Sequence, residues 1–459
     1  MYFYKPKAEE NFAGDVIPFY FNGTFHIFYL LDVNHHQLTG GQHQWAHLST
    51  RDFVTFKEHP LALMLGKEGE ADSASCGTGS VFWDGKLFHI FYLGRSYTTK
   101  GVQIESICHA VSKDLDVWEK DSDNPVSLPV SGYTRENWRD PFVYEEKGIY
   151  HMLVTAEKEK GYENRKAVVA QLVSKDLKRW EIIEDFYAPE TEYQHECPDM
   201  FYYSGYCYLF YSVGGNKKKV YYRKRKLTEE TFHSSYIDYF DGKFLYAAKT
   251  VTDGKRIFLI GFVPAKTREK NEGEWLWGGN LCMLELKQKE NGDLAPFAIR
   301  EQLENYDEIA SVKEKSTELR ANSYNQLTCQ TDTFILRSLG TTESKFCATY
   351  KVRVNVDTKC IFFYLYSDDN LKNAICYQLN LHEGSVTVEI FENGIIVSKE
   401  SVNTIFGEDE YILHFFAEDS VVQLIVDGKI VLTDRYYKKG GNNIFLGIEE
   451  GNLTIWKCR

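Results

Sequence analysis

Proline and methionine are scarce in this 459-residue chain, with 10 and 5 copies, and long apolar runs are absent. No segment approaches the ~18 consecutive apolar residues that a membrane-spanning helix needs. The first residues, MYFYKPKAEENF, contain no apolar stretch of the kind found in secretory signal peptides. We therefore expect a cytoplasmic protein that does not have a membrane as its partner.

Positive charge is also in deficit. Lys and Arg number 53 against 66 Asp and Glu, and the net charge of −13 argues against nucleic acid as a partner. One basic cluster, Lys217–Lys219 with Arg223–Lys226, is interpreted as a solvated hairpin tip rather than a polyanion site. The 10 cysteines form no CxxC pair, which indicates reduced core residues rather than disulfides.

Sequence motifs of several enzyme classes are missing as well. The chain has no Walker loop, no GxGxxG segment before a helix and no GxSxG elbow, so nothing suggests a nucleotide or serine mechanism. A group of histidines invites a zinc interpretation, and its members are His35, His36, His43 and His47. No carboxylate or cysteine completes a recognisable ligand spacing. We therefore expect loop histidines, no metal and no cofactor.

Aromatic residues, in contrast, are abundant, with 31 Tyr, 30 Phe and 8 Trp. They concentrate in an apolar strand that recurs at intervals of roughly 50–63 residues, and four of the five copies directly follow a short turn such as Asn22-Gly23. The five copies are Phe25–Leu31, Phe88–Gly94, Ile149–Thr155, Tyr206–Ser212 and Arg256–Phe262.

Each aromatic strand belongs to a larger repeating unit. A strand and the turn precede it, and after it come a strand, a Ser-x-Asp turn and a further strand with Trp or Phe, as in Ser112–Trp118 and Ser174–Trp180. Such a unit comprises four antiparallel strands, which is one blade of a β-propeller. Five units, with the weakest detail in the fifth, predict an all-β fold in which residues 1–295 form a five-bladed propeller.

The remainder of the chain has a different pattern. Residues 296–322 carry charge and helix formers, and we interpret them as a connector. Residues 323–459 contain seven or so segments with period-two alternation, separated in part by hairpin turns such as Asn393-Gly394, which predicts a C-terminal β-sandwich. The sandwich lacks a comparable set of acids. We expect an accessory module, through which a homo-oligomer would form.

Three acidic residues occupy similar places in three of the units. Asp15 lies ten residues before the first aromatic strand, Asp140 nine before the third and Glu196 ten before the fourth. Because the innermost strand of each blade lines the central channel, acids at an equivalent point of that strand converge at one mouth of it. Converging carboxylates repel one another, so at least one of them is expected to have a raised pKa.

An acid and a base held together are what cleavage of a glycosidic bond requires. Glu196, with its longer side chain and the weakly polar neighbours Cys197 and Pro198, suits the proton donor, and Asp15 suits the nucleophile. Asp140 follows Arg139, whose charge favours the ionised form, so we expect Asp140 to accept hydrogen bonds from sugar hydroxyls.

Five further residues are candidates for substrate binding. Thr78 and Tyr246 occupy the acids' position in the second and fifth units, and Arg139 neighbours an acid. Trp45 has two interpretations of equal weight, stacking on a sugar ring or packing within a blade. Trp277 is a candidate for the pocket wall, with core packing as the alternative.

Several of these segments resemble the motifs of glycoside hydrolase family 32, the invertase, inulinase and levanase family. Glu196–Asp199 (ECPD) and Arg139–Pro141 (RDP) are similar to two of its motifs. Trp45–His47, Thr78–Ser80 and Tyr246–Ala248 resemble its WGHA, SGS and FYA segments. The resemblance covers the whole chain and implies the same two domains, a five-bladed propeller followed by a β-sandwich.

The resemblance implies a retaining β-fructofuranosidase that acts on sucrose or short fructo-oligosaccharides. Asp15 would be its nucleophile, Asp140 its transition-state stabiliser and Glu196 its acid/base. The first motif departs from the family pattern, because WMNDPNG is replaced by a segment that contains Gly14-Asp15-Val16-Ile17-Pro18. The nucleophile is kept, whereas neighbours that shape the sugar subsite are changed.

Other functions stay open at this point. The altered first motif is compatible with another furanoside, such as an arabinofuranoside, or with an unusual fructose linkage such as a difructose anhydride. A fructosyltransferase would share every residue named above. An inverting furanosidase of the related five-bladed families would also use two Asp and one Glu, and a non-catalytic carbohydrate-binding propeller would need no proton donor.

Overall fold

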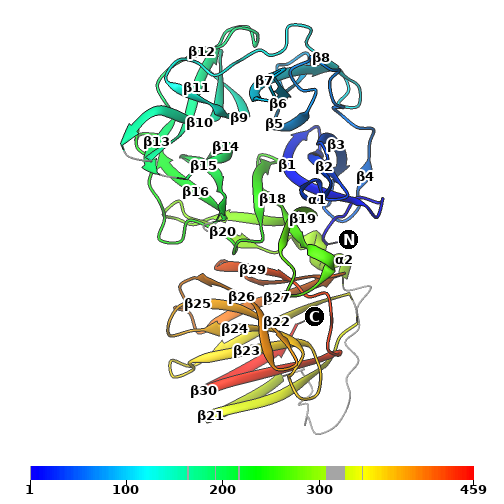
Figure 1. The fold of residues 1–459 in the computed structure, drawn as a ribbon. Coiled ribbons are helices and arrows are strands. Elements are labelled where there is room, and N and C mark those ends of the chain that lie inside the picture. The colour runs from blue at the N-terminus through cyan, green and yellow to red at the C-terminus, as the bar shows by residue number, and fades with distance from the viewer. Residues whose placement is uncertain are drawn as a thin grey trace.

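The computed structural model describes residues 2–162, 165–191, 193–215, 218–306, 326–343 and 345–458. It confirms the predicted fold class: an all-β chain whose five-bladed propeller precedes a β-sandwich (Figure 1). In Figure 1 the propeller lies above the sandwich, and its inner strands surround the centre. Within the described ranges, no helix has the length and apolar character needed to cross a membrane.

The blades follow one another along the chain. Blade 1 contains β1 (Asn11–Phe21), β2 (Thr24–Val33), β3 (Gln44–Thr50) and β4 (Lys57–Glu58). Blade 2 contains β5 (Ser75–Trp83), β6 (Phe88–Tyr97), β7 (Gln103–Ser112) and β8 (Trp118–Lys120). Blade 3 contains β9 (Tyr133–Glu146), β10 (Ile149–Tyr162), β11 (Arg165–Ser174) and β12 (Glu181–Ile182), with β13 (Tyr187–Thr191) also paired to β11.

Blades 4 and 5 complete the ring. Blade 4 consists of β14 (Glu196–Tyr203), β15 (Tyr206–Val213) and β16 (Lys219–Lys226); in place of a fourth strand the described chain has isolated bridges at His233 and Tyr239. Blade 5 contains β17 (Tyr246–Thr252), β18 (Ile257–Lys266), β19 (Trp275–Gln288) and β20 (Leu294–Phe297). The weakest unit is therefore the fourth, not the fifth as predicted.

The ring closes where the two ends of the propeller meet. Ala13 of β1 pairs with Gly279 of β19, and Tyr4 forms an antiparallel bridge with Leu281. The aromatic strands predicted from the sequence are the second strands of their blades, and β18 is buried along its whole length because it lies between β17 and β19. Such continuous burial explains why these segments read as apolar and aromatic runs.

Every innermost strand carries a β-bulge at the same place. In β1, Ala13 pairs with Leu31 and Val16 with Tyr29, so two residues face one on the partner strand. The same two-against-one interruption occurs in β5, β9, β14 and β17. A bulge bends the strand and redirects its side chains, which places special residues at the rim of the sheet. The residues left unpaired are Gly14-Asp15, Gly77-Thr78, Asp140-Pro141, Cys197-Pro198 and Ala247-Ala248.

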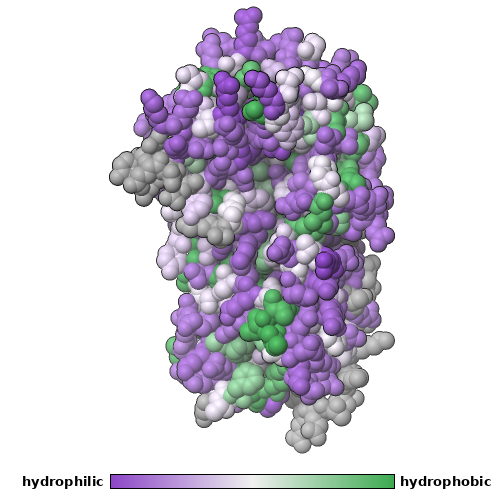
Figure 2. Space-filling view, in the orientation of Figure 1, coloured by the Kyte–Doolittle hydropathy of each residue, from purple (hydrophilic) through white to green (hydrophobic). Residues whose placement is uncertain are grey.

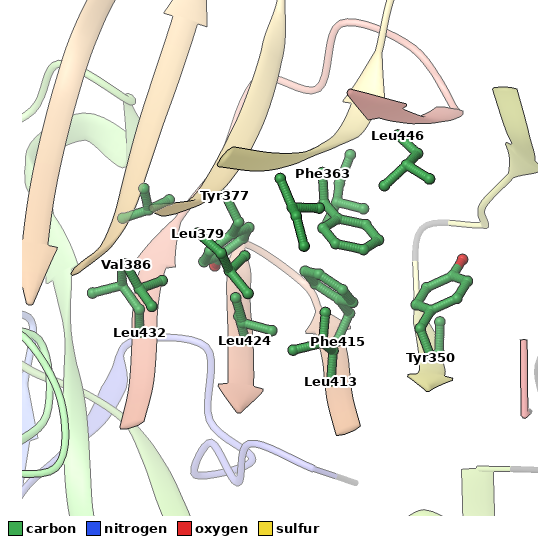
Figure 3. Packing of buried hydrophobic residues seen from close by; sticks show 14 of the residues in the cluster. Tyr350, Phe363, Tyr377, Leu379, Val386, Leu413, Phe415, Leu424, Leu432 and Leu446 are labelled. Carbon is green, nitrogen blue, oxygen red and sulfur yellow. The ribbon is translucent and has the colours of Figure 1, made fainter. Parts of the chain in front are cut away.

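The sandwich contains ten strands among the described residues, more than the seven or so predicted. They are β21 (Gln326–Thr341), β22 (Phe346–Val354), β23 (Cys360–Ser367), β24 (Ala374–Asn380), β25 (Ser385–Glu392), β26 (Ile395–Asn403), β27 (Glu410–Glu418), β28 (Val421–Val426), β29 (Ile430–Arg435) and β30 (Asn443–Lys457). Their inward side chains, among them Tyr350, Phe363 and Phe415, form one apolar core (Figure 3).

The predicted connector, 296–322, lies mostly outside the described residues. Its first part continues the propeller, since β20 (Leu294–Phe297) pairs with β19, and is followed by helix α2 (Arg300–Tyr306). The predicted domain boundaries therefore stay predictions. The predicted homo-oligomer likewise stays a prediction; the face in Figure 2 is mainly hydrophilic, with small separate apolar patches.

The two domains are joined by buried polar contacts. The Arg435 guanidinium of β29 donates to the carbonyl of Val263 (2.7 Å) and to the side chain of Asn280 (2.7 Å) in blade 5. On the sandwich side, the Glu418 carboxylate accepts hydrogen bonds from the backbone N–H groups of Tyr2 (2.6 Å) and Phe3 (3.2 Å). The sandwich therefore holds the chain end that leads into the ring closure.

Candidate active site

The three predicted acids lie together around the bulges of their strands. Asp15 is the second unpaired residue of the β1 bulge, Asp140 the first of the β9 bulge, and Glu196 the residue just before the β14 bulge. The prediction that they are equivalent is corrected, because they occupy three successive positions. Counting back from the aromatic strands concealed this, because six paired residues separate the bulge from the turn in β1 but only five do so in β9 and β14.

Asp15 has one occupied and one free carboxylate oxygen. Thr78 Oγ1 donates to Asp15 Oδ2 at 2.5 Å, and the Cys197 thiol approaches the same oxygen at 3.8 Å. Oδ1 is buried and has no hydrogen-bond partner among the described residues. Burial raises the pKa of Asp15 to about 7, and the negative charges of Asp140 and Glu196 raise it further. The hydrogen bond from Thr78 acts in the opposite direction and lowers the pKa.

Asp140 ties two blades together. Its Oδ2 accepts the backbone N–H of Cys197 at 2.9 Å and the hydroxyl of Thr155 at 3.4 Å. The backbone of Asp140 is left-handed, with φ of 57°, as is that of Cys197 at 53° and Ala247 at 45°, which are the first bulge residues of β14 and β17. Such a conformation costs a non-glycine residue about 1–3 kcal/mol, so strain is concentrated at the acid site.

Glu196 is held by two donors. Arg139 Nη2 lies 3.0 Å from Oε1, and the hydroxyl of Tyr246 donates to Oε2. Arg139 also forms the predicted ion pair with Asp140, with Nε 3.9 Å from Oδ2, so its charge acts on both acids. Arg139 is also bound by Asn137 at 2.6 Å and by the side chain of Gln194, which fixes the direction of its guanidinium.

The other predicted binding residues divide into two groups. Thr78, Tyr246 and Arg139 contact the acids, as described above. Trp45 does not reach the site surface: its ring is fully buried, and its indole N–H donates to the carbonyl of Gly77 at 2.8 Å. The stacking role is corrected in favour of packing within the blades, because a buried ring offers no free face to a sugar.

Trp277 lies beside the nucleophile. A Cβ atom added to Gly14 would lie 1.9 Å from Cη2 of Trp277, so the indole occupies the space that a side chain before Asp15 would need. Where the family motif has Asn, this chain has a glycine, and the Trp277 indole of β19 occupies the space beside it. Trp277 is partly buried and packs against two apolar clusters of the propeller, so its role in the pocket wall stays a prediction.

Two lysines near the acids were not predicted as site residues. Lys218 Nζ lies 4.5 Å from the centroid of the Tyr246 ring, and burial lowers the pKa of Lys218 to about 8 although Asp15 and Glu196 oppose this. The interpretation of its segment as a solvated hairpin tip is wrong for this residue. Lys249 Nζ is buried and donates to the carbonyl of Gly79 at 2.8 Å. Nothing in the sequence distinguishes a partly buried lysine such as Lys218 from its exposed neighbours in a basic run.

Below the acids the channel narrows to a cavity of about 90 Å³. Lys249 and Asp199 line it, and Asp199 accepts the backbone N–H (2.8 Å) and hydroxyl (2.5 Å) of Thr250. Burial raises the pKa of Asp199, and Lys249 opposes the rise. This acid of the ECPD segment thus serves to hold β14 to β17 below the site.

The histidines form two clusters, and both contain a carboxylate. Asp32 lies with His36 and His43, and Asp116 with His47 and His59; within each set the possible ligand atoms lie within 4.8 Å of one another. The expectation that no carboxylate completes the histidine group is therefore corrected. Asp32 lies near the end of β2, whereas Asp116 lies between β7 and β8. The distance of Asp116 from His47 and His59 in the sequence concealed this second cluster.

Comparison with known proteins identifies relatives of this chain. The model "Glycosyl hydrolases family 32 N-terminal domain" matches residues 9–292. Sucrose-6-phosphate hydrolase of Escherichia coli is 26% identical over 310 residues, which are 61% of this chain and 61% of the relative. The enzyme of that name from Streptococcus mutans is 22% identical over 94% of this chain and 88% of its own length.

Solved structures agree on the fold. Fructan 1-exohydrolase IIa from Cichorium intybus superposes with a TM-score of 0.76 at 18% identity, covering 99% of this chain and 96% of that one. Sucrose-6-phosphate hydrolase from Lactobacillus gasseri gives a TM-score of 0.75 at 17% identity, covering 100% and 92%. Together with the family model, which spans more than half of the sequence, these matches show that the chain belongs to glycosyl hydrolase family 32.

Proposed function

We propose that this chain is a retaining glycoside hydrolase that releases terminal β-fructofuranosyl residues from sucrose or short fructo-oligosaccharides. The observation that carries the proposal is the grouping of Asp15, Asp140 and Glu196 at or next to the bulges of β1, β9 and β14. Curated relatives named sucrose-6-phosphate hydrolase and levanase support it, although the alignments cover only 61%, 40% and 38% of the first three relatives and 26% of the levanase.

Asp15 is proposed as the nucleophile because one of its oxygens is free. Thr78 binds Oδ2, whereas Oδ1 has no hydrogen-bond partner among the described residues, so its lone pairs are uncommitted. Because Oδ1 is buried, the attack on the anomeric carbon needs a small rotation of the carboxylate toward the sugar. Thr78 thereby orients the carboxylate without using the attacking atom. The step forms a bond between Oδ1 and the anomeric carbon while the bond to the leaving oxygen breaks.

Glu196 is proposed as the acid/base. It protonates the leaving oxygen in the first step and removes a proton from water in the second, which hydrolyses the covalent intermediate. The pKa of Asp15 is raised to about 7, so Asp15 carries a proton below that pH. A nucleophile must be ionised, which makes the loss of that proton a step of the proposed cycle.

Asp140 is proposed to bind the sugar hydroxyls and to stabilise the transition state. One of its oxygens already accepts the Cys197 N–H and the Thr155 hydroxyl, so the carboxylate is fixed before substrate arrives. Arg139 is proposed to assist substrate binding from its position beside Glu196.

A phosphorylated substrate is a second candidate, and Lys218 favours it. This partly buried cation lies beside Tyr246 and under the influence of Asp15 and Glu196, where an anionic group on the substrate would find a partner. Relatives are named sucrose-6-phosphate hydrolase, which is consistent with such a group. The cytoplasmic location expected from the sequence would fit an imported, phosphorylated sugar.

The test is a substrate panel followed by NMR of the first product formed. The panel contains sucrose, sucrose-6-phosphate, kestose, inulin and levan fragments, a difructose anhydride and an aryl arabinofuranoside. Release of β-fructofuranose before mutarotation supports a retaining fructosidase. Initial release of the opposite anomer would contradict the retaining mechanism, and release of arabinose would contradict the assignment of fructose as the sugar. Transfer of fructose to a second sugar would indicate a fructosyltransferase. Absence of any product would favour a binding propeller.

A further inference from the structure

The loop between β2 and β3 brings three metal-ligating side chains together beside the candidate active site. Asp32 is the last residue but one of β2, His36 begins the short helix α1 (His36–Thr39), and His43 directly precedes β3. The possible ligand atoms of all three lie within 4.8 Å of one another. Two imidazole nitrogens and one carboxylate oxygen form a ligand set that suits zinc.

Two atoms of this cluster are unsatisfied. Asp32 is fully buried, and its Oδ1 accepts the His36 backbone N–H at 2.7 Å and faces His36 Nδ1 at 3.2 Å. Its Oδ2 has no hydrogen-bond partner among the described residues, and His35 Nδ1 lies 3.6 Å from it. His43 Nε2 is likewise buried and without a partner in the described chain. Buried polar atoms are normally satisfied, so a carboxylate oxygen and an imidazole nitrogen without hydrogen-bond partners in the same cluster point to a ligand that binds both.

The ring geometry separates this cluster from the second one. The rings of His36 and His43 are nearly perpendicular, at 82° with centroids 4.3 Å apart, so their in-plane lone pairs are able to converge. His47 and His59 instead stack at 19° and 4.1 Å, with lone pairs that run parallel. Moreover, His59 uses both nitrogens, one toward Ser49 at 2.8 Å and one toward Asp116 at 2.6 Å.

The cluster is connected to the pocket wall. The His43 ring stacks on the Trp277 indole at 4.4 Å, and His36 meets the same indole edge-on at 5.0 Å. The following residue, Gly278, approaches so closely that a Cβ atom there would lie 2.8 Å from Asp32 Oδ2. Trp277 in turn covers Gly14, the neighbour of Asp15. A group bound by the cluster would therefore fix the wall beside the nucleophile.

We propose that Asp32, His36 and His43 bind one divalent transition-metal ion, of which zinc is the probe, and that this ion holds Trp277 in place. A tetrahedral site with bonds of ~2.0–2.1 Å separates ligand atoms by about 3.4 Å, so small side-chain rotations suffice to close the site, and water completes it. Arg95, whose positive charge acts on His43, is bound to Glu105 at 3.0 Å. The ion takes no part in the hydrolysis proposed above.

Isothermal titration calorimetry of the chelator-treated full chain with Zn²⁺ tests the proposal. We expect one ion per chain for the wild type and at least ~10-fold weaker binding for Asp32→Asn and His43→Gln. His59→Gln is the matched control, because it removes a histidine of the second cluster and is expected to leave binding unchanged. Undiminished affinity in both of the first two variants, or absence of binding in the wild type, overturns the proposal.

A second measurement does not depend on whether the variants fold. Co²⁺ added to the wild-type chain is expected to give the visible absorption of a four-coordinate site and to lose it when Zn²⁺ is added. A titration in which no such band grows overturns the proposal. Both readouts are independent of catalysis, so failure of the proposed fructosidase activity leaves this inference standing, and the reverse also holds.

Discussion

The hydroxyl of Tyr246 donates its hydrogen to Oε2 of Glu196, while Arg139 binds the other oxygen of the same carboxylate. Blade 5 therefore supplies the partner that orients an acid of blade 4. The burial of Tyr246 raises its pKa well above the ordinary value, so the phenol keeps its proton and stays a donor at all physiological pH values.

Removal of that donor tests the role of Glu196. Tyr246→Phe leaves Oε2 without its partner, and we expect kcat/KM to fall by ~10- to 100-fold with little change in folding, as in losses of one oriented hydrogen bond. Steady-state kinetics on the substrate found by the panel provide the measurement. Tyr202→Phe is the matched control, because that tyrosine is exposed. Equal losses in the two variants would contradict the assignment.

The pH dependence of kcat/KM distinguishes the roles of the two acids. The pKa of Asp15 is raised to about 7, so Asp15 is protonated below and ionised above that pH. If Asp15 is the nucleophile, kcat/KM rises as the pH increases through about 7, because only the carboxylate attacks. A decline through that pH would instead make Asp15 the proton donor. The profile is measured on the wild type over about pH 5–9.

The same pKa has a consequence for stability. It exceeds the ordinary value of 3.8, so the folded state binds the proton more tightly and stability falls as pH rises between about 4 and 7. Asp15→Asn removes the buried charge. We expect it to be about 1–2 kcal/mol more stable than the wild type at pH 8, a figure reduced because the side chain is only half-buried, and equal in stability below pH ~4.

Urea unfolding of both proteins at the two pH values provides the measurement. A variant that is less stable than the wild type at high pH would contradict the raised pKa. The variant is also expected to lose activity, since an amide is not a nucleophile.

Gly14 and Trp277 form a matched pair. Gly14→Ala places Cβ against the indole, and we expect a loss of about 1–3 kcal/mol in unfolding free energy together with a higher KM. Trp277→Ala in the same chain relieves the overlap, so the double variant should recover part of the stability lost. Gly407→Ala is the control, because nothing lies within 4 Å of the added atom. Full additivity of the two changes would contradict direct packing.

Lys218 discriminates between neutral and phosphorylated substrates. Lys218→Met removes the cation beside Tyr246 while keeping much of the aliphatic side chain. We expect kcat/KM to fall by at least ~10-fold on sucrose-6-phosphate and far less on sucrose, because a charge-assisted contact contributes ~1.5–3 kcal/mol. Lys219→Met is the control, since that lysine lies over Tyr239 instead. Equal losses on both substrates would argue against a phosphate partner.

Much of the fold was predictable because each blade repeats the same sequence features. Apolar second strands and Ser-x-Asp turns recur at regular spacing, and the three acids precede them. The β-bulges were not predictable from the same counts, since an extra residue in a strand changes the register without changing composition. For that reason the acids seemed equivalent although they occupy successive positions.

The rest of the site depends on contacts between distant segments. The burial of Trp45, the proximity of Lys218 to Tyr246 and the approach of Asp32 to His43 arise only when blades and loops assemble. Sequence analysis gave Trp45 two equal roles, and only its burial decided between them. The contact between Gly14 and Trp277 could not be inferred either, because the two residues lie at opposite ends of the propeller sequence.

The contact of Glu418 with the backbone of Tyr2 and Phe3 bears on how the protein unfolds. These residues lead into Tyr4, whose bridge to Leu281 helps to join the first blade to the last. The segment that helps to close the propeller ring is thus held in part by a residue of the sandwich, Glu418. We infer that the C-terminal domain is not a detachable appendage, and that catalytic domain and sandwich melt as one cooperative unit.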